Sequence, residues 1–412
     1  MNRIRVKNFG PVKRGLDSNE GWLDFNKVTI FIGGQGSGKS SIAKLISTFT
    51  WIEKALVRGD LTKKEVENYD RFKKRHCAYQ NIHNFFHTNT ELEFEGRAYH
   101  FSYKNGKFKA QKHTANGFQS PKIMYVPAER NFVSAVVQPE KLKYLPQPLY
   151  TFLEEFIRSN EEIEEDILLP VNDLAYHFDK KKRAFRLIGK QYEILLSEAS
   201  SGLQSAIPLF LVSKNLAEGI HQVHNYSKSR LSIEAKQKLR DQLLKILQDK
   251  GGNDNIQSAA MEILSSIAQN DYFVNIVEEP EQNLFPKSQW AILKSLLEFN
   301  NMNESNRLLI TTHSPYLINY MNLAIQAHAL GLKMQSGNDD TLHHQLNSIV
   351  PKTAQTSGQQ VSIYQFDEKT GNISLLPQPE GIPSGDNYLN NILREGNYLF
   401  DALLELEQEL WH

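Results

Sequence analysis

The sequence predicts an α/β protein in which a mixed sheet is flanked by helices and interrupted by helical insertions. Three apolar segments support this prediction, and each ends in glycine or polar residues: "KVTIFI" at 27–32, "YFVNIV" at 272–277 and "RLLITT" at 307–312. Their lengths suit parallel strands buried on both faces. Because ligands bind at the carboxyl ends of such strands, we expect the residues that follow them to form a site.

The first strand runs into a glycine loop and then a helix. "GGQGSGKSSIAKLIST" at 33–48 matches the phosphate-loop pattern G-x-x-x-x-G-K-[ST], and the spacing of Ile42, Leu45 and Ile46 is helical. Lys39 would neutralise nucleotide phosphates, and the Ser40 hydroxyl would hold Mg²⁺. An accidental glycine-rich turn is the alternative. We expect ATP to contact Gly33, Gly34, Gln35, Gly36, Ser37, Gly38, Lys39, Ser40 and Ser41.

The second strand ends on two adjacent glutamates, in "NIVEEPEQNLFP" at 275–286. We expect Glu278 to approach the magnesium ion through its water shell, and Glu279 to orient and deprotonate the attacking water. An acidic turn at a strand end, without any catalytic role, is the alternative interpretation.

The third strand ends at His313, within "RLLITTHSPYLIN" at 307–319. On a strand beside the glutamates, this histidine could contact the γ-phosphate and report its presence. The alternative is a histidine with a purely structural role.

A second polar turn opens an apolar helix in "SEASSGLQSAIPLFLV", with Ser200, Ser201, Gly202 and Gln204 at its start. Such a helix N-terminus can bind an anion. One nucleotide does not need two of these sites, so the second is best explained as serving a partner subunit.

These four motifs, in this order, resemble an ABC-type ATPase head of the kind found in SMC proteins, RecF-like repair ATPases and OLD-family proteins. The fingerprint "EEPEQNLFP…TTHSP", together with "YVPAERN" at 125–131, resembles the OLD-like AAA family ATPases, including the ATPase subunits of bacterial antiphage systems of the Septu and PARIS types. The resemblance covers about 1–50, 120–135, 195–215 and 272–320. It implies a P-loop NTPase fold of the ABC-ATPase head type.

The resemblance also implies a homodimer, or a higher homo-oligomer, in which ATP and Mg²⁺ are sandwiched between subunits. Ser200 and Gly202 would then contact the γ-phosphate of the partner, and Glu279 would be the catalytic base. Glu281 and Asn283 would lie in a loop that reaches the neighbouring subunit. The signature turn departs from the usual Leu-Ser-Gly-Gly-Gln, because Ser201 stands where a glycine is usual. This departure is consistent with slow or gated turnover.

We expect a single ABC-type ATPase head over 1–412, and we interpret the remaining segments as insertions into this domain. We expect a helical and hairpin insertion at 51–120, an insertion before the signature at 136–195, and a helical insertion at 214–270. Within these, Asn105-Gly106 marks a hairpin, and amphipathic helices are expected at 231–247 and 256–268. The extension at 320–412 contains a second hairpin and a final helix, but no TOPRIM nuclease pattern.

Two smaller clusters leave alternatives open. His76, Cys77, His83 and His87 could bind zinc, although a single cysteine favours a structural role. Basic runs at 71–76 and 179–186 could contact DNA, or could be ordinary solvated surface.

Composition sets limits on function and location. The chain has 412 residues, with 47 Lys and Arg against 47 Asp and Glu, so net charge does not indicate nucleic-acid or membrane binding. Cys77 is the only cysteine, which excludes an intrachain disulfide. No segment resembles a signal peptide or a membrane span, and we expect a cytoplasmic protein.

These observations lead to one functional hypothesis and two alternatives. The hypothesis is an ATPase subunit that oligomerises with ATP and scaffolds or regulates a separate effector, a nuclease or toxin, in antiphage defence. One alternative is a RecF-like or SMC-like repair ATPase that clamps DNA. The other is a nearly inactive ATP-dependent scaffold.

Overall fold

The computed structural model describes residues 2–113, 118–136, 138–141, 143–225, 270–334 and 340–410. A seven-stranded mixed sheet forms its centre, in the order β2-β16-β15-β4-β14-β13-β8. The five strands from β15 to β8 run parallel, whereas β16 is antiparallel to β15. The strands are β2 (Gly15–Leu16), β4 (Val28–Gly33), β8 (Pro121–Val126), β13 (Tyr272–Glu278), β14 (Arg307–Thr312), β15 (Val361–Phe366) and β16 (Asn372–Leu375).

Two smaller antiparallel sheets flank this centre. The first has the order β3-β1-β5-β6-β7 and the second the order β12-β11-β10-β9. The first comprises β1 (Asn2–Phe9), β3 (Trp22–Phe25), β5 (Phe86–Glu95), β6 (Tyr99–Lys104) and β7 (Lys107–Lys112). The second comprises β9 (Ile167–Leu168), β10 (Ala175–Asp179), β11 (Ala184–Ile188) and β12 (Glu193–Leu195).

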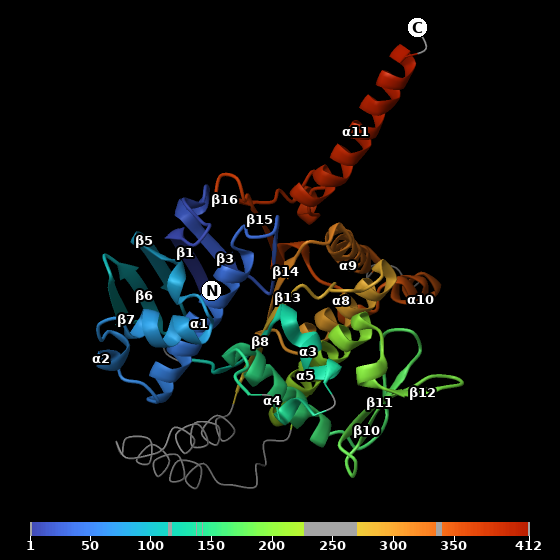
Figure 1. Cartoon of the computed structure of the whole chain (residues 1–412), viewed down its shortest axis with the longest axis horizontal. Helices are drawn as coiled ribbons and strands as arrows, with labels where there is room; N and C mark the ends of the chain where they lie inside the picture. Colours follow the sequence, from blue (N-terminus) through green and yellow to red (C-terminus); the bar gives the residue numbers. More distant parts are fainter. Residues whose placement is uncertain are drawn as a thin grey trace.

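Helices cover both faces of the central sheet. Figure 1 shows α1 and the five-stranded sheet on one side, with α5, α8 and α9 on the other. The helices are α1 (Lys39–Arg58), α2 (Lys63–Val66), α3 (Phe132–Ala135), α4 (Gln147–Glu161), α5 (Ser201–Asn225), α8 (Pro286–Asn301), α9 (Pro315–Met334), α10 (Asp340–Ile349) and α11 (Tyr388–Leu410). No helix in the described ranges combines the length and the apolar character needed to cross a membrane.

The central strands contribute to two hydrophobic cores because their side chains alternate between the two faces. In β4, Ile30 and Ile32 face the core beneath α5 and α8, whereas Phe31 faces the core beneath α1. All seven residues of β13 are buried. This burial confirms the expectation of a strand covered on both faces, and it explains why the apolar runs in the sequence are nearly continuous.

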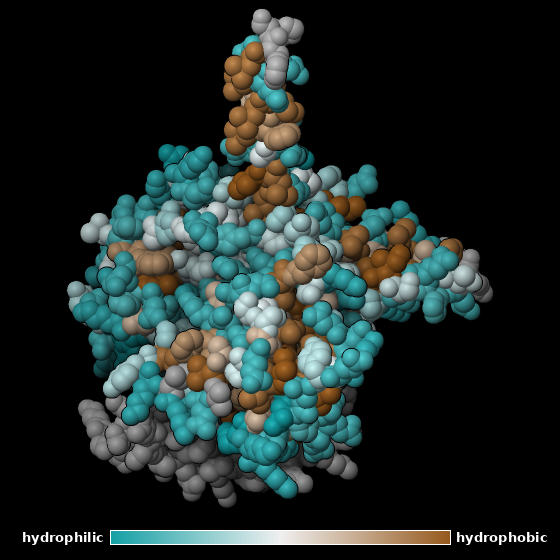
Figure 2. All heavy atoms as spheres, turned by 45° about the vertical axis from the view of Figure 1, so that its right-hand side comes forward, coloured by the Kyte–Doolittle hydropathy of each residue, from teal (hydrophilic) through white to brown (hydrophobic). Residues whose placement is uncertain are grey.

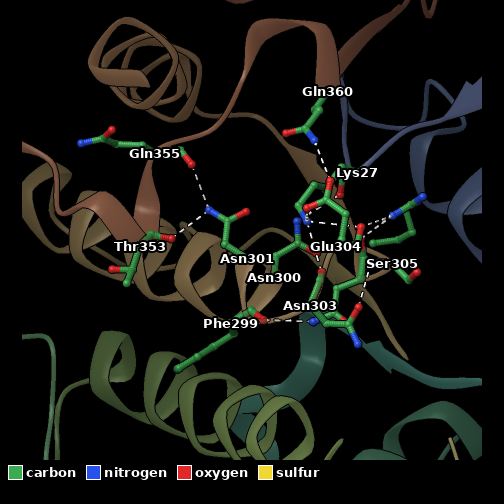
Figure 3. A network of polar contacts seen from close by, with 12 residues as sticks. Lys27, Phe299, Asn300, Asn301, Asn303, Glu304, Ser305, Thr353, Gln355 and Gln360 are labelled. Atoms are coloured by element: carbon green, nitrogen blue, oxygen red, sulfur yellow. Dashed lines mark hydrogen bonds and ion pairs between the residues drawn. The ribbon is translucent and has the colours of Figure 1, made fainter. Parts of the chain in front are cut away.

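A network of polar contacts joins the segments at the amino-terminal end of the parallel strands (Figure 3). Lys27 Nζ donates a hydrogen bond to the Asn303 carbonyl at 3.1 Å, and Asn300 Nδ2 donates to the Lys27 carbonyl at 3.1 Å. Asn301 Nδ2 reaches the Gln355 carbonyl at 3.0 Å. The turn after α8 is therefore tied to the start of β4, which fixes the register of these strands before they reach the opposite edge.

Several expectations about local structure are confirmed. The three predicted strands are β4, β13 and β14, and β6 and β7 form a hairpin around Asn105-Gly106, both with positive φ. The second hairpin is β15 and β16, and the final helix begins at Tyr388. The helices predicted at 231–247 and 256–268 lie outside the described residues.

The segment predicted as an insertion at 51–120 is integrated into the fold. Helix α1 continues through residue 51 and ends at Arg58, so no boundary exists there. Strand β5 pairs with β1, which places the hairpin in a sheet with the first residues of the chain. Pairing between strands about eighty residues apart gives no local signal in the sequence.

The ring of Phe49 is central to the core beneath α1. It is fully buried and stacks on Phe94 at 5.1 Å and on Phe72 at 5.3 Å between ring centroids. We expect Phe49→Ala to lower the free energy of unfolding by about 3–5 kcal/mol, because it leaves a cavity among packed rings. Phe132→Ala, at a side chain that is 44% exposed, should change it by less than about 1 kcal/mol. Equal effects in chemical denaturation would contradict this account of the core.

Candidate functional site

The candidate site lies at the carboxyl edge of the central sheet. Strand β14 is parallel to β4 on one side and to β13 on the other, and the three strands end at the same level. The chain then continues into the glycine loop after β4, into His313 after β14, and into Glu279 after β13. The topology thus brings three of the predicted motifs together, as expected from the rule for parallel strands.

The glycine loop has a backbone that side chains would not tolerate. Gly33, Gly36 and Gly38 have φ values of 144°, 72° and 103°. A Cβ atom on Gly33 would lie 2.2 Å from the Phe366 carbonyl oxygen, so β15 packs directly against the loop. Gly38 caps the N-terminus of α1, and the loop therefore leads straight into the helix whose N–H groups can bind an anion.

Lys39 is folded back onto this loop. Its Nζ donates hydrogen bonds to the carbonyls of Gly33 at 2.9 Å and Gly34 at 2.8 Å, and the residue is 5% exposed. Burial lowers the pKa of Lys39 to about 8, and nearby Glu279 and Glu281 oppose that shift. The buried charge destabilises the fold fully below about pH 8, and the penalty falls as the pH rises further. An anion bound in the loop would relieve it.

The other predicted loop residues differ in exposure. Ser37 Oγ donates to the Gly34 carbonyl at 2.8 Å, which closes the loop from within. Gln35 is exposed, Ser40 is partly buried, and Ser41 is buried on α1. Ser40 is therefore the hydroxyl of this pair that remains near the surface for a metal ion.

Glu279 adopts a strained backbone at the end of β13. Its φ is 43°, a left-handed conformation that residues other than glycine rarely adopt. Its N–H still donates to the Thr311 carbonyl at 2.8 Å, and its carboxylate lies 3.7 Å from His313 Nε2. Burial, followed by repulsion from Glu278, raises the pKa of Glu279. A carboxylate with a raised pKa and a neighbouring imidazole has the properties of a general base.

The His313 ring lies between the glutamate and the loop. Burial and the Lys39 charge lower the pKa of His313, whereas a hydrogen bond to the Gly33 backbone raises it. The ring therefore connects the acidic strand to the glycine loop. Its place on the strand neighbouring β13 confirms the position predicted for it; its contact with a γ-phosphate remains a prediction.

A fully buried cation, Arg130, holds the acidic turn in place. Its guanidinium donates to the carbonyls of Glu278 and Glu279, each at 2.6 Å, and of Ser205 at 3.1 Å and Pro127 at 3.3 Å. Burial lowers its pKa to about 10, against attraction from four glutamates nearby. The segment "YVPAERN" contributes to a family resemblance, but no local pattern in it predicts this role of Arg130.

Glu278 is suited to the metal role expected of it. The residue is 4% exposed, and Oε2 accepts a hydrogen bond from the Ala128 N–H at 3.2 Å. Oε1 is buried and has no hydrogen-bond partner among the described residues. A carboxylate oxygen without a partner fits a hydrated Mg²⁺ ion, which binds through few protein ligands and the phosphates of its nucleotide. Ser40 and Glu278 are the residues that would hold it.

The Glu281 carboxylate makes contacts within its own chain, whereas the resemblance places Glu281 in a loop that reaches the neighbouring subunit. Its Oε1 accepts hydrogen bonds from Thr312 Oγ1 and from the His313 N–H, both at 2.7 Å. The carboxylate is thus turned inward, and it positions the chain at the exit of β14. Asn283, with φ of 58°, is exposed at the same turn, and its role at an interface remains a prediction.

The predicted signature turn lies at the N-terminus of α5, and it packs against the acidic turn of its own chain. A Cβ on Gly202 would lie 2.5 Å from the Asn283 carbonyl oxygen, and Gln204 Nε2 donates to the Ser197 carbonyl at 2.9 Å. Ser200 and Ser201 are exposed. Within the described ranges, no hydrogen bond or ion pair joins the signature residues to the glycine loop of the same chain.

The two smaller clusters are not part of this site. His76 and Cys77 are buried, and no group of three His, Cys, Asp or Glu side chains in the described ranges could hold a metal ion. The basic run at 71–76 follows α2, whereas the run at 179–186 forms the turn between β10 and β11, on the other side of the molecule in Figure 1. The two runs do not form one basic surface on a single chain.

Comparison with solved structures finds SMC and ABC-type proteins. An SMC head bound to the C-terminal winged-helix domain of ScpA has 10% identity and a TM-score of 0.34, over 77% of this chain and 91% of its own. The SMC head domain from Thermotoga maritima has 12% identity and a TM-score of 0.31, over 77% and 90%. A dimeric ATP-binding cassette in a post-hydrolysis state, bound to ADP and phosphate, has 10% and 0.27, over 77% and 90%.

No family model and no curated protein matches the sequence. The sheet order and the side-chain geometry of this chain define the site. They bring together a glycine loop of the phosphate-loop pattern with its lysine, a carboxylate suited to a metal ion, a carboxylate suited to be a base, and a histidine.

Arg130 should be the most sensitive residue of this edge. Arg130→Lys keeps the charge, but one ammonium group cannot reach four carbonyls on three segments. Since each buried carbonyl left without a donor costs about 1–3 kcal/mol, we expect the free energy of unfolding to fall by more than about 2 kcal/mol. Arg183→Lys, at an exposed arginine with an ion pair of 3.8 Å to Glu161, is the matched control. Indistinguishable denaturation curves for the two variants would refute the role given to Arg130.

Proposed function

We propose that this chain is an ABC-type ATPase that binds ATP and Mg²⁺ between two copies of itself, hydrolyses ATP, and scaffolds a separate effector protein. The observation that carries the proposal is the convergence of Lys39, Glu278, Glu279 and His313 at one edge of three parallel strands. A phosphate loop alone would fit many nucleotide-binding proteins. The paired glutamates and the histidine on the adjacent strand favour one that hydrolyses its nucleotide.

The residues would divide the reaction between them. Lys39 would leave its carbonyl partners for the β- and γ-phosphates, with the N–H groups of the loop and α1. Mg²⁺, when bound beside Ser40 and Glu278, supplies positive charge against the phosphates. Glu279 would accept a proton from the attacking water at a carboxylate oxygen. His313 would orient Glu279 and contact the γ-phosphate.

The exposure of Ser200 and Ser201 supports a site shared between subunits. Among the described residues neither serine side chain has a hydrogen-bond partner, and both lie at the N-terminus of a long helix, where a phosphate held by a second copy could bind. The proposed assembly is therefore a head-to-tail dimer with two nucleotides, or a larger oligomer built from it.

The effector and the role in antiphage defence rest on the resemblance of "EEPEQNLFP…TTHSP" to the ATPase subunits of such systems. Among the described residues that follow His313, no group of three His, Cys, Asp or Glu side chains could hold a metal ion. A DNA-clamping role receives less support, because the two basic runs lie far apart on one chain.

Hydrolysis and assembly are tested together with Glu279→Gln. Removing the base should lower steady-state hydrolysis by at least about 100-fold while ATP still binds, so that the protein accumulates as an ATP-bound dimer. The measurements are single-turnover hydrolysis and mass by light scattering, with and without ATP and Mg²⁺. Glu164→Gln, at an exposed glutamate, is the control. Unchanged turnover in Glu279→Gln would rule out its role as the base, and negligible turnover in the wild type would favour an inactive scaffold.

The shared site is tested with Ser200→Glu. A carboxylate at this exposed position should repel the partner's γ-phosphate, so ATP should bind but the mass should stay that of a monomer in the Glu279→Gln background. Ser348→Glu on α10 is the matched control, because Ser348 is also exposed. Gly202 is unsuited to this test, since any side chain there collides with the Asn283 carbonyl. Dimerisation of Ser200→Glu equal to that of the control would argue against the shared site.

Nucleotide binding should also take up protons near pH 8. Lys39, with its pKa lowered to about 8, is partly neutral there, and bound phosphates favour its charged form. We therefore expect ATP affinity to fall as the pH rises from 7 to 9. Calorimetric titrations at pH 8 in HEPES and in Tris should give different enthalpies, which report the protons taken up. Identical enthalpies in the two buffers would contradict the placement of Lys39, and Lys39→Met should abolish any difference.

A further inference from the structure

Helix α11 extends away from the body of the molecule without any protein covering it. Figure 1 shows it projecting as a single helix, and all residues from Asn391 to Leu410 are exposed. At 1.5 Å per residue, its 23 residues span about 34 Å. Most of the stability of helices in proteins comes from the packing of an apolar face, and the exposed part of α11 has no such packing within the described chain.

The exposed surface of α11 is largely apolar. In Figure 2 the projecting helix carries hydrophobic side chains along its length. Leu399, Leu403 and Leu406 are 64%, 63% and 57% exposed, and Leu410 is 85% exposed. An apolar surface of this size is rarely left open to solvent, and it indicates an interaction site.

Five of the exposed apolar residues of α11, together with Gly396, follow a coiled-coil spacing. Ile392, Gly396, Leu399, Leu403, Leu406 and Leu410 are separated by four, three, four, three and four residues. We call this row the α11 seam. A seam with alternating intervals of three and four residues faces a second helix along its whole length, and its side chains interlock with those of an equivalent seam.

We propose that α11 pairs in parallel and in register with α11 of a second copy of this chain, without any nucleotide. In this arrangement each seam residue meets its own counterpart. The charged residues that flank the seam do not oppose this arrangement, because Glu395 of one helix would lie beside Phe400 of the other, and Ala402 beside Glu407. No two like charges face each other across these flanking positions.

The opposite orientation is disfavoured by charge. Antiparallel pairing along the same seam would place Glu395 of each helix beside Glu409 of the other, so that two like-charged pairs form, one at each end. Asp401 and Glu405 lie away from the seam in either orientation, so they remain in solvent and do not oppose pairing.

The paired helices would be attached next to the glycine loops. The Tyr388 hydroxyl, at the first residue of α11, donates to Glu368 Oε1 at 2.9 Å. A Cβ on Gly34 would lie 2.7 Å from Glu368 Oε2 and 2.8 Å from the Tyr388 hydroxyl. A dimer joined through α11 therefore holds two glycine loops on one scaffold, whether or not these loops also meet around ATP.

Disulfide trapping tests the pairing directly, because Cys77, the only cysteine, is fully buried. Leu406→Cys places a thiol in the seam, and Gln408→Cys places one on the outer side of the same helical turn. Under mild oxidation without nucleotide, Leu406→Cys should form a covalent dimer at least about tenfold faster than Gln408→Cys. In an antiparallel pair the two residues at 406 would be about 15 Å apart along the axis, too far to form a disulfide.

The mass in solution provides a second measurement. The nucleotide-free protein should have the mass of a dimer at micromolar concentration, and the double variant Leu399→Glu, Leu406→Glu should have half that mass. Both side chains are exposed, so the thermal unfolding of the body should be unchanged. The same halving should occur in the Lys39→Met background, which separates this contact from any dimer that ATP forms.

Three outcomes would overturn the proposal. A wild-type protein that is monomeric without nucleotide would mean that another protein covers the seam. Equal cross-linking at positions 406 and 408 would show an unspecific encounter. A dimeric mass without cross-linking through Leu406→Cys would show a different orientation or a different contact.

Discussion

The site depends on one buried cation, Arg130, which is bound by main-chain oxygens instead of a carboxylate. Where β13 ends, the backbone turns into a left-handed conformation at Glu279, and the carbonyls of Glu278 and Glu279 leave the sheet's hydrogen-bonding pattern. Buried carbonyls need donors, and the flat guanidinium offers five in fixed directions. Arg130 donates hydrogen bonds to both of these carbonyls and to that of Ser205 on α5. These bonds stabilise the strained turn that carries the Glu278 and Glu279 carboxylates.

The same edge of the sheet concentrates charges that are poorly solvated. Burial is the largest cause of each pKa shift there: it raises the pKa of Glu279 and Glu281 and lowers that of Lys39 and His313. The charges partly neutralise one another, but Lys39 has to bond to loop carbonyls in the absence of an anion. A polyanion bound in the loop would give Lys39 a charged partner in place of neutral carbonyls, so part of the electrostatic cost of burying Lys39 would be offset on ligand binding.

Local patterns in the sequence were sufficient for the elements that carry their own signal. The apolar runs predicted β4, β13 and β14, and the glycine spacing predicted the loop and the start of α1, because buried parallel strands and phosphate loops impose those compositions directly. The inward turn of Glu281 and the role of Arg130 could not be predicted. Both depend on contacts between segments distant in the sequence: Glu281 with the exit of β14 about thirty residues later, and Arg130 with carbonyls about 150 residues away. The sequence predicted that α11 is a helix but not that it is exposed. Exposure depends on whether other parts of the folded chain pack against the helix.

The signature turn and the acidic turn of one chain behave as a single unit. Gly202 packs against the Asn283 carbonyl, Ser205 Oγ donates to Gln282 Oε1 at 3.0 Å, and Arg130 links the Ser205 carbonyl to Glu279. A displacement of Ser200 would therefore be transmitted to Glu279 through the contacts that join the signature turn to the acidic turn. In the proposed dimer, the chain that supplies Ser200 to its partner's nucleotide also carries a base for its own. Contact between Ser200 and the partner's nucleotide would thus position Glu279 at the chain's own nucleotide. The reason is that Arg130 bonds to both the signature turn and the acidic turn.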